Sequence, residues 1–135
     1  MYSQTYERIP MVAAPLDTCG ILFLFGADYQ NLVNAQKTNK LVANILLNYK
    51  YSTGKDVHSS STELCDVEAS WLLFSTEYLQ CSTLPLVVNE SGYTVVDTAS
   101  GTPTIMALDW TETGMKEFES EISRRLLTWK SPLSL

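Results

Sequence analysis

The sequence of 135 residues predicts a small α+β domain: a mainly antiparallel sheet of three or four strands, two or three helices packed on it, and an extended N-terminal arm. Three observations predict this class. Strand-like segments separated by turn residues follow one another over 86–110. Apolar residues recur with helical spacing over 29–51, 63–82 and 113–130. Because the strands are grouped instead of alternating with helices, we expect antiparallel pairing.

The N-terminal arm is expected to span residues 1–20, and a single domain is expected over 21–135. Pro10 and Pro15 interrupt the arm, and its apolar side chains keep no regular period. Ordering such a segment by itself costs conformational entropy that few internal contacts offset. We therefore expect the arm to contact neighbouring subunits. The apolar side chains proposed for that contact are Ile9, Met11, Val12 and Leu16.

A strand and a helix are expected after the arm. The continuous apolar run 21–25 lies between two glycines and has the length and aromatic content of a strand buried on both faces. Asp28 is placed to cap a helix over 29–51, since its carboxylate accepts hydrogen bonds from the first free backbone N–H groups. The polar residues 36–40 weaken the apolar face of this helix, so we expect it to be broken or partly exposed there.

The segment 63–82 shows the most regular helical stripe. Ser60 and Glu63 fit a capping box at its start, and Pro85 follows its end. Its apolar residues step by three or four positions along one helical face. They are Leu64, Val67, Trp71, Phe74, Tyr78 and Cys81.

The C-terminal half carries the predicted sheet and the last helix. Two short apolar runs, 86–88 and 93–96, flank a four-residue turn and predict a hairpin. A third strand is expected over 104–110, after a second polar turn. Thr113 is placed to cap a helix that ends near Lys130. Acidic residues lie early in this helix and basic residues late, as the helix dipole favours.

Charge is distributed unevenly along the chain, whose net charge is −6. No Lys or Arg occurs from Asp56 to Met115, where nine acidic residues lie. Phosphate backbones and anionic lipids bind clustered cations, so we expect no sequence-specific nucleic-acid binding and no membrane partner. An acidic surface suits a basic neighbour or the wall of a lumen. The acidic side chains proposed for contact are Glu63, Asp66, Glu68, Glu77, Glu90, Asp97, Asp109 and Glu112.

The three cysteines, Cys19, Cys65 and Cys81, are widely and irregularly spaced. An odd number without a CxxC pattern argues against a secreted disulfide framework. We expect reduced thiols in a cytoplasmic protein, or in a virion assembled in a host cytoplasm. If 63–82 is one helix, Cys65 and Cys81 lie about 24 Å apart, which excludes a disulfide between them.

Two short segments resemble catalytic signatures. The segment around Asp97 resembles the Asp-Thr-Gly signature of retroviral-type aspartic proteases, with Ala99 where the signature has glycine. The segment around Asp109 resembles the nucleophile loop of haloacid-dehalogenase-type phosphatases, with Thr111 where that family has a second acid. We interpret the first as a polar turn and the second as a strand end followed by a helix cap.

The single histidine, His58, lies in a polar loop without the spaced partners that a metal site needs. We therefore expect no metal, no cofactor and no enzymatic activity. An active site that converges only in three dimensions would draw on His58, Asp97 and Asp109.

The favoured interpretation is a non-enzymatic structural component of a larger assembly, such as a head–tail neck or tail protein of a bacteriophage virion. Its partners are then protein subunits, in a homo-oligomer or a multi-protein assembly. The alternative is a stand-alone acidic binding module, such as an immunity protein, an antitoxin or a secretion chaperone. Such a module would cover a basic partner and use charge to speed association.

Overall fold

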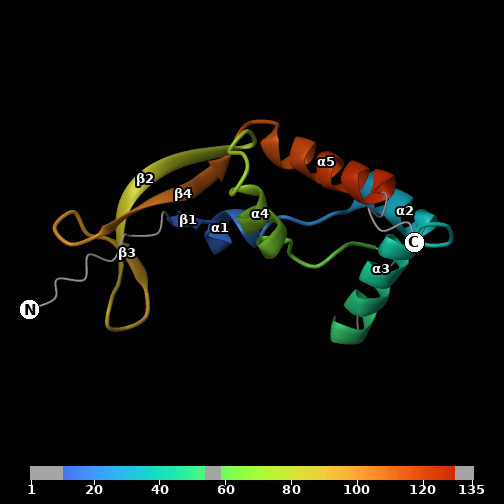
Figure 1. The fold of residues 1–135 in the computed structure, drawn as a ribbon, viewed down its shortest axis with the longest axis horizontal. Coiled ribbons are helices and arrows are strands. Elements are labelled where there is room, and N and C mark those ends of the chain that lie inside the picture. Colours follow the sequence, from blue (N-terminus) through green and yellow to red (C-terminus); the bar gives the residue numbers. More distant parts are fainter. Residues whose placement is uncertain (1–10, 54–58, 130–135) are drawn as a thin grey trace, which may run out of the picture.

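The computed structural model of the chain describes residues 11–53 and 59–129. Within them, five helices and a four-stranded sheet confirm the predicted α+β class. Figure 1 shows a long, curved sheet at one end of the molecule and the group formed by α2, α3 and α5 at the other. None of the described helices has the length and apolar character needed to cross a membrane.

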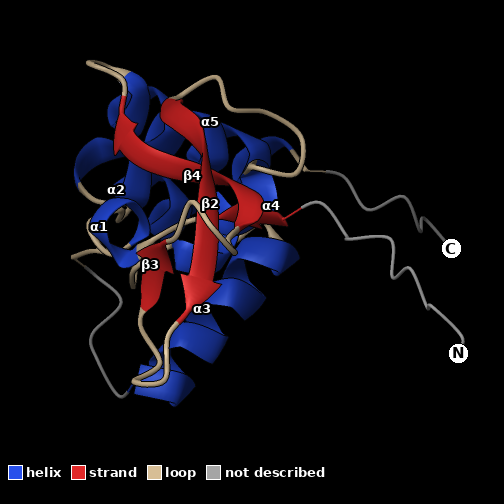
Figure 2. Ribbon diagram, turned by 90° about the vertical axis from the view of Figure 1, so that its left-hand side faces the viewer, coloured by secondary structure: helices blue, strands red, loops and turns tan. Residues whose placement is uncertain are grey.

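The sheet has the strand order β1-β4-β2-β3 (Figure 2). Its long central strands, β2 (Leu79–Val88) and β4 (Thr102–Trp110), pair antiparallel along most of their length. The short strand β3 (Thr94–Val96) pairs antiparallel with the end of β2. The equally short β1 (Met11–Ala13) runs parallel to β4. The predicted hairpin and the predicted third strand are therefore confirmed, and β2 begins earlier than expected.

The turn of the hairpin is set by two residues. The side-chain oxygen of Asn89 accepts hydrogen bonds from the backbone N–H groups of Ser91 (3.1 Å) and Tyr93 (2.9 Å). Gly92 has a φ of 84°, a conformation that glycine adopts without the steric penalty of a side chain. Both choices favour the chain reversal that carries β2 into β3.

Two helices replace the one predicted over 29–51. The helices of the described chain are α1 (Leu16–Cys19), α2 (Gly26–Ala35), α3 (Lys40–Thr53), α4 (Cys65–Trp71) and α5 (Gly114–Thr128). The side-chain oxygen of Asn39 accepts hydrogen bonds from the N–H groups of Leu41 (3.0 Å) and Val42 (3.2 Å), and so caps α3. The break therefore falls inside the polar segment 36–40, as expected.

The strand predicted over 21–25 is wrong. Leu22 and Leu24 are buried while Ile21 and Phe25 are exposed, so the segment is extended but buries one side only. It pairs with no long strand. Its carbonyl groups accept single hydrogen bonds from the segment before α4: Ser61 N–H to Leu24 (2.9 Å) and Leu64 N–H to Leu22 (3.0 Å).

Asp28 lies in the first turn of α2, not at its cap. Its carboxylate accepts a hydrogen bond from the Ser120 hydroxyl (2.9 Å), and its carbonyl accepts one from the Ser123 hydroxyl (3.1 Å). Asp28 therefore fastens α2 to α5. The last helix itself agrees closely with the prediction, beginning after Thr113 and burying Phe118.

The predicted helix 63–82 is wrong beyond Trp71, where α4 ends. The chain turns and enters β2 at Leu79, because pairing with β4 along a whole strand outweighs a helical stripe that fits only locally. Phe74, expected in the buried stripe, is 84% exposed. The capping box is also absent, since Leu64 occupies the N-cap position.

Two apolar cores hold the domain together. The first lies where the sheet meets α4 and α5. Phe118 packs there edge-on against Trp71 and at a tilt against Trp110, with ring centroids 5.2 and 5.5 Å apart. Its buried members are Leu22, Leu72, Leu79, Ala107, Trp110 and Phe118. The second lies among α2, α3 and α5, and its buried members are Leu24, Tyr29, Leu32, Val33, Val42 and Leu46.

Residues 11–20, the described part of the predicted arm, take part in the domain. They form β1 and α1; Val12 packs against the first core, and Thr18 is buried. Of the apolar side chains proposed for contact, Met11 and Leu16 are exposed, whereas Ile9 lies outside the described residues. An arm that contacts neighbours is thus restricted to residues 1–10, which stay a prediction.

Candidate functional site

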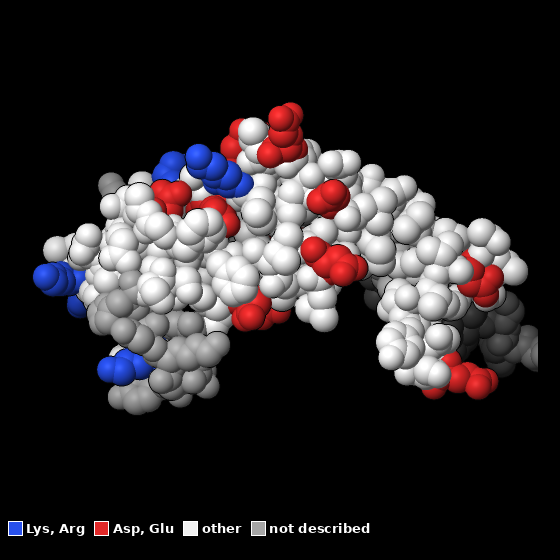
Figure 3. Space-filling view, turned by 180° about the vertical axis from the view of Figure 1, so that it is seen from behind, with Lys and Arg blue, Asp and Glu red and all other residues white. Residues whose placement is uncertain are grey.

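The acidic side chains proposed for contact do not gather in one place. Glu77 and Glu90 lie before and after β2, whose ten residues span about 33 Å. Asp66 lies in the first turn of α4, and Glu63 precedes that helix. Figure 3 shows acidic side chains spaced along the whole length of one face, with the basic ones at the end of the helices. The cation-free stretch of sequence therefore does not form one acidic patch on that face.

Glu68 is a clear departure from the expected acidic surface, because its side chain is 0% exposed. The Thr18 hydroxyl lies 2.7 Å from Glu68 Oε1, and Glu68 Oε2 has no hydrogen-bond partner in the described chain. Burial raises the pKa of this carboxyl, and the bond from Thr18 opposes the rise. Glu68 therefore joins α4 to α1 inside the fold and is not available to a partner.

The thiols lie close to this buried carboxyl. Burial, followed by a side-chain hydrogen bond with Cys65, raises the pKa of Cys19 to about 12. Burial and the charge of Glu68 raise the pKa of Cys81. All three cysteines are free, and the raised pKa values of Cys19 and Cys81 favour the protonated thiol over the thiolate.

The residues of the two catalytic resemblances stay apart. The Asp97 carboxylate accepts hydrogen bonds from Ala99 N–H (2.8 Å) and the Ser100 hydroxyl (2.5 Å), bonds that hold its pKa below the usual range. Asp97 lies beside Pro85 and Asp109 opposite Gln80, which are about 17 Å apart along β2 at the rise of a strand. His58 lies outside the described residues. No described group of three or more His, Cys, Asp or Glu side chains is placed to hold a metal ion.

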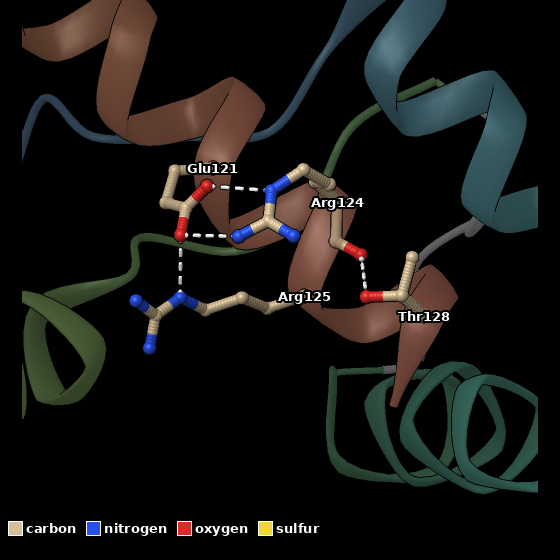
Figure 4. A network of polar contacts seen from close by, with 4 residues as sticks. All are labelled: Glu121, Arg124, Arg125 and Thr128. Carbon is tan, nitrogen blue, oxygen red and sulfur yellow. Dashed lines mark hydrogen bonds and ion pairs between the residues drawn. The ribbon is translucent and has the colours of Figure 1, made fainter. Parts of the chain in front are cut away.

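The two arginines of α5, Arg124 and Arg125, are paired within the chain. Glu121 accepts hydrogen bonds from Arg124 through two nitrogens and from Arg125 through one, all at 2.7 Å (Figure 4). These bonds hold the pKa of Glu121 at about 2. The guanidinium of Arg125 also lies 4.8 Å from the ring centroid of Trp71. These arginines therefore support the packing of α5 on α4, and an anionic ligand would have to displace Glu121.

The exposed end of the sheet carries a different kind of surface. A shallow hollow of about 420 Å³ crosses all four strands, from Met11 on β1 to Thr94 on β3. Val88 and Tyr93 are each 70% exposed beside it. The exposed large apolar side chains of the strands and the hairpin turn are Met11, Val88, Tyr93, Val95, Val96, Ile105 and Leu108. Successive residues such as Val95 and Val96 point to opposite faces of the sheet, so these side chains are divided between its two faces, and Leu108 lies toward the other end of β4. Exposed apolar side chains of this kind are typical of a protein–protein contact.

The two outer strands leave their edges open. Within 11–53 and 59–129, no strand pairs with the outer edge of β1 or of β3. Monomeric proteins usually block such edges with Lys, Pro or a covering element. The four strands contain a single charged residue, Asp109, and it lies at the opposite end of β4. The edges of β1 and β3 therefore carry no cation, and the shortness of the two strands, three residues each, is the protection that remains.

Sequence reasoning missed this surface because it counted charges and not strand edges. The signal was present: the runs 86–88 and 93–96 are apolar at successive positions, which a strand with one solvated face does not need. Glu68 had a signal too, since it lies four residues after Leu64 and four before Leu72 and so shares their buried face. No protein-family model and no curated protein matches the chain.

Proposed function

We propose that the chain is a non-enzymatic subunit of a protein assembly, and that copies of it associate through the exposed end of the sheet. The single observation that carries this proposal is the open edge of β3. That strand has three exposed residues, no charge and no outer partner among the described residues. Backbone groups at such an edge pair readily with a strand of another chain.

The apolar side chains around the edge supply the driving force. Val88 and Val96 are exposed on adjacent strands, and Tyr93 lies in the turn between them. Removing apolar surface from water contributes about 25 cal/mol per Å². Edge pairing alone would leave these side chains in water, whereas a second subunit placed over the hollow buries them.

A ring or a tube would form if the open edge of β3 contacts a different surface of the next copy. The sheet projects from one end of the molecule and the helices form the other (Figure 1). When unlike surfaces of successive copies are in contact, the copies form a closed ring if the rotation from one copy to the next divides a full turn evenly. A neck or tail protein of a bacteriophage virion is a subunit of such an assembly, and this remains the class that we propose. Its location would be the virion or the cytoplasm.

The stand-alone acidic module has less support. A basic partner would need several acidic side chains close together on the surface. Glu77 and Glu90 lie at opposite ends of β2, and Glu68 is buried. An association that depends mainly on the apolar sheet should change little with salt, whereas charge-steered binding slows steeply as salt rises.

Substitution of one edge residue tests the proposal. Val96→Lys places a cation on β3, in the way that natural sheets protect their edges. Asn34→Lys is the matched control, because it adds the same charge to an exposed position of α2, away from the sheet. In sedimentation velocity we expect the unmodified chain and Asn34→Lys to form the same oligomer and Val96→Lys to dissociate. Equal association of Val96→Lys and the unmodified chain would contradict the proposal.

A further inference from the structure

The second core contains an apolar pocket that its own side chains leave unfilled. The pocket has a volume of about 260 Å³ and lies between α2, α3, α5 and the segment 61–67. None of the described side chains that line it is charged. Six of the apolar ones are Leu24, Leu32, Leu46, Leu64, Ile122 and Leu126.

Water is a poor occupant of this pocket. A buried water needs two to four polar partners, and the hydroxyls of Ser61 and Thr62, which line the pocket, already donate to backbone carbonyls. Ser61 Oγ accepts a hydrogen bond from Leu24 N–H (2.9 Å) and donates one to the carbonyl of Thr62 (2.7 Å). An apolar void without water deprives the side chains around it of dispersion contacts, which makes filling it favourable.

The pocket is open to ligands from the side of α3. Ile45 lines it and is 42% exposed, whereas the next residue, Leu46, lines it from a buried position. A guest can therefore enter past Ile45 without unfolding the domain. Apolar protein cavities of about 150 Å³ bind benzene, so a larger one has room for a fused ring pair or a short alkyl chain.

We propose that this pocket is a binding site for a small, neutral, apolar molecule. Its class follows from the lining: aliphatic side chains surround it, one aromatic residue, Tyr29, borders it, and no described side chain there pairs with a charge. A carboxylate or phosphate group on the guest would have to remain outside the mouth near Ile45. The site is separate from the exposed end of the sheet, and the two can be tested independently.

Naphthalene, a neutral fused ring pair that is itself fluorescent, is a suitable probe for the chain. We expect saturable binding with one probe per chain and a rise in its fluorescence. Leu46→Phe fills the pocket and should weaken binding about tenfold or more. Leu47→Phe, the same change at the exposed neighbouring position on α3, should leave affinity within about twofold of the unmodified chain.

A second pair of variants avoids changing the core. Ile45→Glu places a carboxylate at the mouth, which the bound probe would desolvate, so affinity should again fall about tenfold. Leu47→Glu adds the same charge outside the pocket and should bind the probe normally. If Leu46→Phe does not fold, the Ile45 and Leu47 pair decides the question. The proposal is overturned if the unmodified chain binds no probe, or if Ile45→Glu binds it as tightly as Leu47→Glu does.

Discussion

The hydroxyl oxygen of Thr18 lies 2.7 Å from Glu68 Oε1 and 3.0 Å from the carbonyl oxygen of Pro15. A hydroxyl group has one proton and can donate it to only one of these acceptors. Thr18 donates it to Glu68 Oε1, the shorter contact, and this bond lowers the pKa of Glu68 while burial, the larger effect, raises it. The hydrogen bond between Thr18 and the buried Glu68 therefore joins α4 to α1.

Replacing Glu68 by Gln should flatten the dependence of stability on pH. A buried acid with a raised pKa stabilises the fold fully below the pKa of the unfolded chain, about 4.3, and this contribution is lost as pH rises through the folded pKa. Glutamine keeps the shape and the hydrogen bond to Thr18 but cannot ionise. Urea unfolding in buffers between about pH 4 and pH 8 should show a smaller loss of unfolding free energy for Glu68→Gln than for the unmodified chain.

Glu119 provides a comparison for the Glu68 experiment. Its pKa is also raised, by burial first and then by the nearby charge of Asp28. Glu119→Gln should therefore also reduce the loss of unfolding free energy with rising pH. Glu68 and Glu119 lie in different helices, α4 and α5, so the reductions from the two substitutions should add. An unchanged pH profile for Glu68→Gln would mean that its carboxyl is ionised in the folded chain.

Replacing Thr18 by Val should destabilise the domain by about 1–3 kcal/mol, because Glu68 Oε1 then loses its hydrogen-bond partner while remaining buried. Thr18→Ser keeps the hydroxyl and should cost less. Chemical denaturation of both variants at one pH measures the difference. A Thr18→Val variant as stable as the unmodified chain would show that the hydroxyl contributes nothing.

Asn39 should be the most sensitive position in the connection between α2 and α3. Its oxygen caps α3, and its amide N–H donates to the carbonyl of Leu126 at 3.1 Å. We expect Asn39→Ala to cost about 1–2 kcal/mol of unfolding free energy. Asn39→Asp retains the capping oxygen and loses only the donor to Leu126. The melting temperature of Asn39→Asp should lie between those of the unmodified chain and Asn39→Ala. If Asn39→Asp loses as much stability as Asn39→Ala does, the cap is not the main contribution of Asn39.

Gly101 should tolerate no side chain. A Cβ atom there would collide with the backbone of Asp97 and of Pro85, neither of which can move without breaking the contact between the 97–101 turn and β2. Gly101→Ala should therefore cost about 1–3 kcal/mol. Ser100→Ala removes one exposed hydrogen bond in the same turn and should have a smaller effect. Thermal unfolding compares the two, and equal melting temperatures would contradict the steric explanation.

The parts of the fold that the sequence predicted correctly rest on local signals. Asn89 and Gly92 mark the hairpin turn, and the dipole-ordered charges and apolar stripe of α5 mark the last helix. The failures involve contacts between distant segments. The helical spacing of 72–82 is real but gives way to pairing with β4, and the apolar run 21–25 has no strand beside it to pair with.

The candidate surface was predicted only indirectly. The absence of Lys and Arg from 56–115 was interpreted as an acidic face, but the carboxylates lie apart, and one of them, Glu68, is buried. The absence of Lys and Arg matters instead at β3, where no cation blocks the edge of the sheet. Which apolar runs become edges depends on strand order, and strand order is a property of the whole fold that no short segment encodes.

The native mass of the unmodified chain in solution tests self-association most directly. Light scattering after size exclusion, over about a hundredfold range of protein concentration, distinguishes a stable oligomer from weak contact. We expect one discrete mass that is a multiple of the 15.1 kDa of a single chain and does not change when salt is raised. A mass of one chain at every concentration would contradict assembly through the open sheet edge.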